Sequence, residues 1–401
     1  MGIKDVVMVS ACRTPIGDFL GSLKDVTARD LAITAGKEAI RRACISCDIV
    51  DEICMGQVYG AMQGSLPARQ VGVRIGLPYR SIASVVNQNC ASGMRAIEIA
   101  AHNLMLGKTE IALVVGVESM SSTPYLLPKA RTGYRMNAGT IEDHMIHDAL
   151  FDELVPGHMG ITAENIAEKY GITRKECDEL ALLSHQRARK AIKEGKFNEE
   201  IIQVEIRTGK GIKIFNNDEH PREDASIETM AKLKPFFKND GVITAANASG
   251  INDAAAAVVL MTKEKAVELG IRPIMKLISV CSEGVDPKLM GIGPAVTIPK
   301  CLDQASLKFQ DIEIWEINEA FAPQFLGCGR KLKQDLGIEI DMEKTNLNGS
   351  GIALGHPVGC TALRIIVTLY YEMVRQEATL GGASLCAGGG PGMTSLWTRE
   401  I

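Results

Sequence analysis

This 401-residue sequence has few aromatic residues, no long apolar run and almost no excess of one charge. Its longest uninterrupted apolar run, from Ala254 to Met261, is far shorter than the roughly 20 residues that a membrane-spanning helix requires. Forty-four basic and 48 acidic residues leave a net charge of −4, without the basic excess that nucleic acid or an anionic membrane would need. We therefore expect neither nucleic acid nor a membrane as a partner.

A secretory signal and a disulfide framework are also missing. The first ten residues carry Lys4 and Asp5 in a short alternating segment, which is not the basic-then-apolar layout of a signal peptide. Eleven cysteines are spread over the whole chain, and Cys44 and Cys47 lack a second pair at zinc-binding spacing. These features predict a cytoplasmic protein with reduced thiols and no metal site.

What the sequence does contain is a folded, globular composition, with 46% hydrophobic and 23% charged residues. Two segments read as the same strand–helix–strand unit. The first consists of a strand at Ile82–Gln88, a helix at Ala91–Leu106 and a strand at Ile111–Glu118. The second consists of Asn346–Pro357, a helix at Thr361–Arg375 and a strand at Gly382–Cys386. The repeated unit predicts a duplicated α/β fold of parallel sheets covered by helices, with reactive groups at the carboxyl ends of strands.

A charged, loop-rich segment separates the two units. Within it, Thr173 and Glu176 form a capping box that opens a helix ending at Gly195, and 162–170 reads as another helix. We expect an N-terminal core domain of residues 1–120 plus 250–271, an inserted loop domain of 121–249 and a C-terminal core domain of 272–401. An insertion at this point of the chain would cover the strand ends where chemistry is expected.

Cys90 is the first candidate catalytic residue. It lies in Asn-Gln-Asn-Cys-Ala-Ser-Gly, between a predicted strand and an amphipathic helix. The N–H groups and dipole at a helix N-terminus favour the thiolate, which is the form of cysteine that attacks a carbonyl carbon. A buried structural thiol is the alternative interpretation.

Three further residues lie at corresponding strand ends of the second half. His356 is flanked by glycines in Leu-Gly-His-Pro-Val-Gly, where an imidazole could polarise a carbonyl or accept a thiol proton. Cys386 precedes Ala-Gly-Gly-Gly-Pro-Gly and could exchange protons near neutral pH, while the glycine N–H groups could hold an oxyanion. Asn318 could orient a water molecule, although each of these residues could also be structural.

Four separated blocks of this sequence resemble the thiolase family. They are Asn89-Cys-Ala-Ser-Gly93, Asn318-Glu-Ala-Phe-Ala322, Gly355-His-Pro-Val-Gly359 and Cys386-Ala-Gly-Gly-Gly-Pro-Gly392. The resemblance covers essentially the whole chain. It implies an α/β thiolase fold, in which duplicated βαβ core domains form a five-layered αβαβα arrangement with an inserted loop domain.

The resemblance also implies roles for individual residues. Cys90 corresponds to the nucleophile that accepts the acyl group, and His356 to the residue that activates it. Cys386 corresponds to the acid/base, and Asn318 to the asparagine that fixes a water in one oxyanion hole. The N–H groups of Cys90 and Gly388 correspond to the other oxyanion hole.

Coenzyme A is implied as a co-substrate, with no permanently bound cofactor. The positions that match family contacts to the acyl-CoA substrate are Leu150, His158, Met159, Arg222, Phe237, Ala248, Ser249, Ala320 and Phe321. Residues 121–139 resemble the family's tetramerisation loop, which implies a homotetramer built as a dimer of dimers. Val155-Pro-Gly157, Pro323 and Pro391 depart from the family pattern.

The resemblance implies an acyltransferase that condenses two acetyl-CoA to acetoacetyl-CoA and free coenzyme A through an acetyl-Cys90 intermediate, or catalyses the reverse thiolysis. The nearest alternative is a 3-ketoacyl-CoA thiolase that acts on longer chains. A decarboxylating ketosynthase would carry a second histidine where Cys386 stands, and a non-catalytic acyl-CoA-binding protein would not need these reactive side chains.

Overall fold

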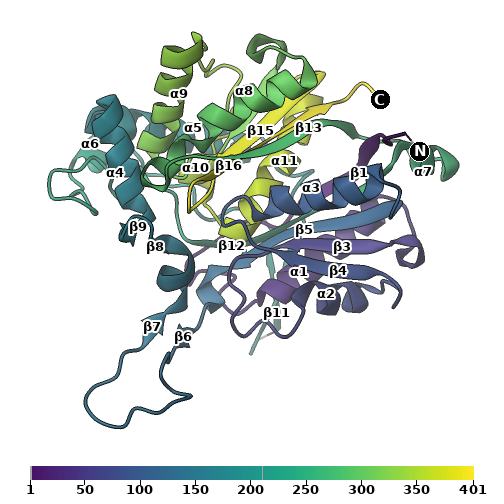
Figure 1. Ribbon diagram of the computed structural model, residues 1–401, viewed down its shortest axis with the longest axis horizontal. Helices are drawn as coiled ribbons and strands as arrows, with labels where there is room; N and C mark the ends of the chain where they lie inside the picture. The colour runs from purple at the N-terminus through teal and green to yellow at the C-terminus, as the bar shows by residue number, and fades with distance from the viewer. Residues whose placement is uncertain (1, 210) are drawn as a thin grey trace.

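The structure is a computed structural model that describes residues 2–209 and 211–401. Within this part of the chain, one sheet of ten strands crosses the molecule (Figure 1). In spatial order the strands are β14 (Ile314–Ile317), β15 (Leu380–Cys386), β16 (Pro391–Thr398), β13 (Met275–Gly284), β1 (Val6–Arg13), β12 (Asn252–Thr262), β5 (Ile111–Ser119), β3 (Glu52–Gly56) and β4 (Ile82–Val86), with β2 (Gly17–Asp18) paired to β12.

The strand order repeats on either side of the β1–β13 contact, as duplication requires. In the N-terminal half, β3 pairs in parallel with β4 and β5, whereas β12 is antiparallel to β5 and β1. In the C-terminal half, β14 and β15 are parallel, and β16 is antiparallel to β15 and β13. The expectation of parallel sheets is therefore wrong for the middle of the sheet. One cause is the short 387–390 turn joining β15 to β16, since a short turn can join only antiparallel strands.

Helices and sheet halves form five layers, which confirms the predicted αβαβα fold. Apolar residues repeat at helical spacing along α1 (Ala28–Arg42), which packs with α2 (Pro67–Ile75) on the outer face of the N-terminal half. Two buried helices, α3 (Ser92–Met105) and α11 (Val358–Arg375), lie between the halves (Figure 1). The outer face of the C-terminal half is covered by α8 (Gly293–Ala305) and α9 (Ala322–Leu336).

The first predicted strand–helix–strand unit is confirmed as β4, α3 and β5. In the second unit, α11 and β15 are confirmed, but the expected strand before α11 is reduced to one bridge between Thr345 and Trp315. Residues 351–354 instead form the single helical turn α10 (Gly351–Leu354). Gly349 (φ +76°) and Gly355 (φ +100°) adopt backbone conformations that no regular strand contains, which explains the interruption.

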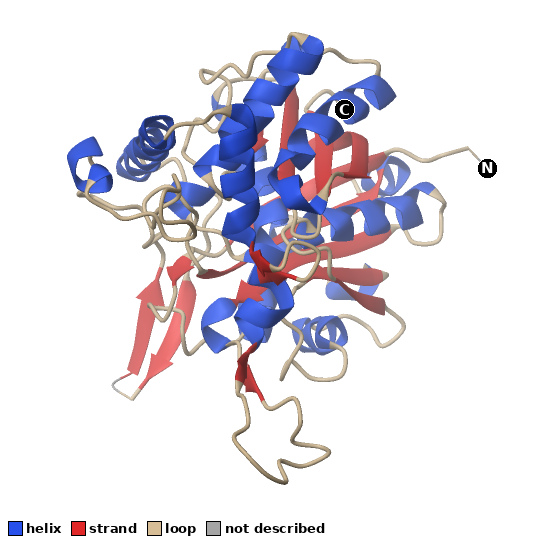
Figure 2. Cartoon of the chain, turned by 60° about the vertical axis from the view of Figure 1, so that its left-hand side comes forward, coloured by secondary structure: helices blue, strands red, loops and turns tan. Residues whose placement is uncertain are grey.

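The segment between the halves contains α4 (Met159–Tyr170) and α5 (Arg174–Lys193). The predicted capping box is present, because Thr173 and Glu176 exchange hydrogen bonds at the start of α5. The loop between β6 (Tyr125–Leu126) and β7 (Glu142–Asp143) extends away from the body of the molecule (Figure 2). The remaining α-helices and paired strands of the described residues are β8 (Phe151–Asp152), β9 (Gly157–His158), β10 (Val204–Thr208), β11 (Gly211–Phe215), α6 (Ile227–Ala231) and α7 (Lys263–Glu268).

Two further findings concern helix length and the cysteines. Among the described residues, no helix is both long enough and apolar enough to cross a membrane. All eleven cysteines are free thiols, and eight of them are buried.

Candidate active site

Chain segments from both halves and from the insertion enclose one cavity of about 290 Å³. Cys90 precedes α3, His356 precedes α11, and Cys386 is the last residue of β15. Twelve of the fourteen predicted site residues line this cavity: Cys90, Leu150, His158, Met159, Phe237, Ala248, Ser249, Ala320, Phe321, His356, Cys386 and Gly388. The two sulfurs and the imidazole therefore face a common space.

Cys90 and His356 form a hydrogen-bonded pair, with 3.1 Å between Sγ and Nε2. On the far side of the ring, Nδ1 lies 2.7 Å from the Thr361 hydroxyl, whose own proton is donated to the Pro357 carbonyl at 3.0 Å. The Thr361 oxygen therefore accepts from Nδ1–H, which leaves Nε2 unprotonated. In this tautomer Nε2 can accept the thiol proton of Cys90.

The resting pair is a neutral thiol and a neutral imidazole. Burial raises the pKa of Cys90 to about 11, although the N–H groups of Gly388 and Cys90 itself oppose that rise. Burial, assisted by the positive charge of Arg364, lowers the pKa of His356 to about 3. The N–H groups favour the thiolate, as the position before α3 predicts, but desolvation opposes them and has the larger effect on the pKa. The sulfur must lose its proton to Nε2 as it attacks.

The elbow around Cys90 is held by a strained backbone residue. Asn89 has a φ of +47°, and its side-chain amide donates to the Gly388 carbonyl at 3.1 Å. Its own N–H donates to the Asn87 side chain at 2.9 Å. The hydrogen bond between Asn89 and Gly388 connects the loop before α3 to the turn after β15, so that Cys90 and Gly388 remain adjacent.

Cys386 is a buried thiol that retains its proton strongly. Burial, followed by the proximity of Cys90 and Cys328, raises its pKa well above the usual value. Burial therefore favours the thiol form of Cys386 over the thiolate. When deprotonated, such a thiolate would be a strong base.

Asn318 and Arg222 do not line the cavity. Asn318 follows β14 and is fully buried, and neither its Oδ1 nor its Nδ2 has a hydrogen-bond partner within the described residues. A buried amide with free polar atoms fits a position that binds a water molecule or a substrate oxygen. Arg222 is exposed, and its backbone N–H donates to His185 Nδ1 at 3.3 Å.

Aromatic side chains form one wall of the cavity. The rings of His158 and Phe237 stack at 4.7 Å, and Phe321 meets Phe237 edge-on at 6.3 Å. Phe237 occupies the space above Gly160, where a Cβ would lie only 2.1 Å from the ring. His158 Nδ1 accepts the Gly160 N–H at the start of α4, and burial lowers the pKa of His158. This wall is therefore uncharged and suited to an apolar chain.

The sequence-based prediction missed several lining residues. Most are neighbours of predicted ones, but Met120 and Met290 are distant from the four sequence blocks, and only the fold brings them to the cavity. The remaining missed residues are Asn89, Ala149, Phe236, Thr244, Ala245, Gly250, Ile251 and Val358.

Two of the departures from the family pattern have a structural explanation. Pro323 occupies the first turn of α9, where its missing N–H has no helical partner to lose. Pro391 begins β16, and its carbonyl accepts the Ala387 N–H at 2.8 Å to close the turn after Cys386. Among the described residues, no group of three or more His, Cys, Asp or Glu side chains could hold a metal ion.

Comparisons with known proteins agree with this geometry. Residues 6–264 match the family described as thiolase, N-terminal domain, and residues 271–399 match thiolase, C-terminal domain. An acetyl-CoA acetyltransferase of Syntrophomonas wolfei is 47% identical over 97% of this chain and 98% of its own length.

Solved structures give the same result. A structure of an acetyl-CoA acetyltransferase from Syntrophomonas wolfei superposes with a TM-score of 0.98 at 60% identity, covering 99% of this chain and 100% of that one. Human mitochondrial 3-ketoacyl-CoA thiolase superposes with a TM-score of 0.94 at 37% identity, covering 99% of each chain. The chain belongs to the thiolase family.

Proposed function

We propose that this protein is an acetyl-CoA C-acetyltransferase, which condenses two acetyl-CoA to acetoacetyl-CoA and coenzyme A and catalyses the reverse thiolysis. The observation that carries the proposal is the Cys90–His356 pair, 3.1 Å apart in a cavity that Cys386 also lines. The names of the bacterial relatives support acetyl-CoA as the substrate. Coenzyme A is a co-substrate, and no resident cofactor is needed.

The first half-reaction transfers an acetyl group to Cys90. The sulfur attacks the thioester carbonyl while His356 Nε2 accepts the thiol proton, and the N–H groups of Cys90 and Gly388 stabilise the oxyanion. Coenzyme A leaves as a thiolate and takes the proton of Cys386. Acetyl-Cys90, an imidazolium and a Cys386 thiolate remain.

The second half-reaction forms the carbon–carbon bond. The Cys386 thiolate removes a proton from the methyl group of a second acetyl-CoA, and its high proton affinity favours this transfer. Asn318, through a water molecule, and His356 stabilise the enolate oxygen. The enolate attacks acetyl-Cys90, the carbon–sulfur bond breaks, and the departing Cys90 thiolate recovers its proton from His356.

Cavity size favours a short acyl group. The space of about 290 Å³ is closed by Leu150 and Met159, and the Met159 side chain lies directly against Gly388. The residues at 155–157 have smaller side chains than is usual in short-chain members of the family. The length of the acyl chain that the enzyme accepts is therefore the property to test. We further propose that Arg222 and the aromatic wall bind coenzyme A, and that residues 121–249 form the domain that holds it.

Two exposed apolar regions support a homotetramer. Strand β4 lies at the edge of the sheet, with its outer side unpaired. Its Ile82 is 56% exposed, and Tyr79 nearby in the sequence is 82% exposed. Strand β6 carries Tyr125 and the β6–β7 loop carries Met136, which are 67% and 85% exposed. An exposed edge and an apolar loop are surfaces that a second copy can cover, giving a dimer of dimers. We place this assembly in the cytoplasm.

Turnover of paired substrates tests the proposal. Acetoacetyl-CoA plus coenzyme A should be cleaved with a kcat/KM at least tenfold above that of a 3-ketoacyl-CoA of eight or more carbons. The opposite preference would favour the long-chain thiolase. Turnover of a malonyl thioester would favour a ketosynthase, and intact acyl-CoA binding without any cleavage would favour a non-catalytic protein.

A further inference from the structure

The Cys90–His356 pair spans the boundary between the two halves of the molecule. Cys90 belongs to the N-terminal half, whereas His356 lies in the turn between α10 and α11 of the C-terminal half. Their 3.1 Å contact therefore depends on what holds this turn against the other half. Two buried side chains, from adjacent strands of the N-terminal half, hold the turn in place.

Asn252, the first residue of β12, holds the beginning of the turn. Its Oδ1 accepts the His356 backbone N–H at 2.9 Å, and its Nδ2 donates to the Gly17 carbonyl at 3.1 Å and to Asp18 Oδ1 at 3.3 Å. Asn252 is fully buried. A Cβ at Gly355 would lie 2.5 Å from its amide carbon, so the turn rests directly on this side chain.

Glu118, in β5, holds the end of the same turn. Its Oε2 accepts the Gly359 N–H at 3.0 Å and the Val58 N–H at 2.9 Å, and its Oε1 accepts the Tyr59 N–H at 3.3 Å. Gly359 lies in the first turn of α11, which has no side-chain cap of its own. Glu118 thus supplies from the other half the acceptor that this helix start lacks.

The glycines on either side of His356 make these contacts possible. A Cβ at Gly359 would lie 2.5 Å from the Val117 carbonyl and 2.7 Å from Glu118 Oε2. Side chains at positions 355 and 359 would therefore push the turn away from β5 and β12. Neither Glu118 nor Asn252 lines the cavity, so both act through His356 rather than on the substrate.

We propose that Glu118 and Asn252 are positioning residues that set the distance between His356 Nε2 and Cys90 Sγ across the boundary of the two halves. The inference rests on the proposed function in so far as that pair transfers the proton during acylation. Displacing a catalytic group by about 1 Å can lower a rate on the order of 100-fold.

The test measures the reaction of Cys90 with iodoacetamide, followed by mass spectrometry of the peptide that contains Cys90, together with the rate of acetylation by acetyl-CoA. Glu118→Ala and Asn252→Ala should each slow both reactions about 10–100-fold, mainly in kcat rather than KM. Glu118→Gln keeps an acceptor for the Gly359 N–H and should recover most of the rate. The control is Glu52→Gln, a buried carboxyl on β3 that bonds Asn103 and Thr109 and does not touch the turn.

The decisive comparison places the same substitutions in a His356→Ala background. If both residues act through the imidazole, they should have almost no further effect on alkylation there, because the group that they position is absent. Equal slowing in both backgrounds, or unchanged alkylation in folded single variants, would overturn the inference. A different result would separate the two proposals: alkylation that the substitutions slow as predicted, in a protein that does not turn over acetyl-CoA. It would contradict the proposed function and leave the positioning role supported.

Discussion

Two regions of the molecule bury ionisable groups beside α11, but they differ in whether those groups have partners of opposite charge. The cavity holds Cys90, His356 and Cys386 without a directly bound counter-charge, and burial keeps all three neutral. The second region, here called the ionic cluster, consists of Arg13, Glu200, Asp218, Glu316 and Arg364. There Asp218 and Glu200 outweigh burial and keep Arg13 charged, whereas burial still raises the pKa of Glu316 beside the more distant Arg364. The comparison shows that only closely bound partners of opposite sign preserve a buried charge.

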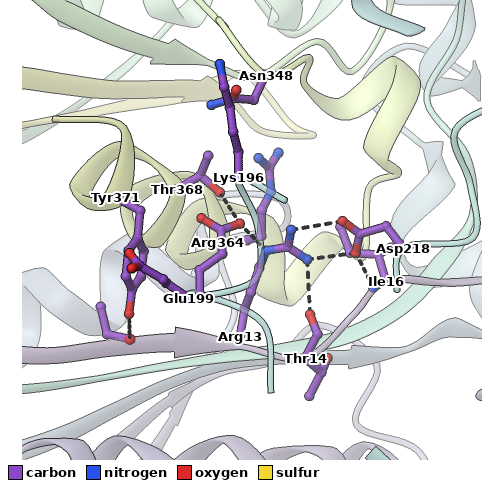
Figure 3. A network of polar contacts seen from close by, with 12 residues as sticks. Arg13, Thr14, Ile16, Lys196, Glu199, Asp218, Asn348, Arg364, Thr368 and Tyr371 are labelled. Carbon is purple, nitrogen blue, oxygen red and sulfur yellow. Dashed lines mark hydrogen bonds and ion pairs between the residues drawn. The ribbon is translucent and has the colours of Figure 1, made fainter. Parts of the chain in front are cut away.

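Arg13 is the centre of the ionic cluster. Its guanidinium donates to both oxygens of Asp218 at 2.7 and 2.9 Å (Figure 3). It also donates to Glu200 at 2.6 Å. Burial disfavours the charge of Arg13, but Asp218 and Glu200 outweigh that effect and raise its pKa. These ion pairs of Arg13 therefore link β1 to the segment after α5.

Arg364 and Glu316 are less well matched, with 3.9 Å between their closest atoms. Both are fully buried, and their charged atoms have no hydrogen-bond partner among the residues that the structure describes. Burial raises the pKa of Glu316 to about 8 despite Arg364. Arg364 also helps to lower the pKa of His356, so the ionic cluster acts on the cavity along α11.

The largest effect is expected at Cys90. Cys90→Ser should lower kcat by about 10⁴-fold or more, because an alcohol cannot replace the thiol as a nucleophile toward a thioester. Steady-state thiolysis of acetoacetyl-CoA measures the loss. Cys44→Ser, at an exposed cysteine outside the cavity, is the control and should retain full activity.

Cys386→Ala should separate the two half-reactions. Acetylation of Cys90 by acetyl-CoA should continue, whereas condensation should fall by about 10²–10⁴-fold because the base is removed. Rapid-quench measurement of each half-reaction distinguishes them. Equal loss in both would show that the two cysteines do not have separate roles.

In the ionic cluster, removal of Arg364 alone should lower the free energy of unfolding more than removal of both Arg364 and Glu316. At pH 9, above the pKa of Glu316, Arg364→Met leaves the Glu316 carboxylate buried without a cation and should lower the free energy of unfolding by about 3–5 kcal/mol. Arg364→Met combined with Glu316→Leu should restore stability or exceed it by about 1–4 kcal/mol. Urea denaturation measures both, and additive losses would contradict the contrast between the two regions.

Asn318→Ala should lower kcat by about 10²–10³-fold through loss of one oxyanion contact. Thermal stability should change little, because the two polar atoms of this buried amide have no hydrogen-bond partner among the described residues that the substitution could break. Kinetics and the melting temperature together test this, and unchanged kcat would remove Asn318 from the mechanism.

The smallest effect concerns pH. Glu316 has a pKa of about 8 in the folded state against 4.5 when unperturbed, so between these values the unfolded chain releases a proton that the folded chain keeps. Stability is therefore lost as pH rises through about 8. The plot of unfolding free energy against pH should be shallower between pH 6 and 9 in the Arg364→Met, Glu316→Leu double variant, and an unchanged slope would contradict this origin.

The sequence allowed much of the cavity to be predicted, because its residues stand in contiguous blocks at strand and helix ends. The segment before α11 was wrongly expected to be a strand, since alternation around Gly349 and Gly355 does not reveal their left-handed backbone. The neutral state of Cys90 could not be predicted either, because it depends on burial by chain segments far away in the sequence.

The ionic cluster could not be predicted at all. Its five residues come from separate elements, and a charged residue at one position of a helix, such as Arg364, usually faces solvent. Only the packing of α11 against both halves makes that position internal. Glu118 and Asn252 were missed for the same reason, because they contact the turn through backbone N–H groups that no motif identifies.

The central claim is that Cys90, activated by His356, carries the acyl group. Incubation with [1-¹⁴C]acetyl-CoA, rapid acid quench and peptide mapping should place one acetyl group per chain on Cys90, and the label should be absent from Cys90→Ser and strongly reduced in His356→Ala. Label on Cys386 or another residue, or full turnover without any labelled enzyme, would contradict the account.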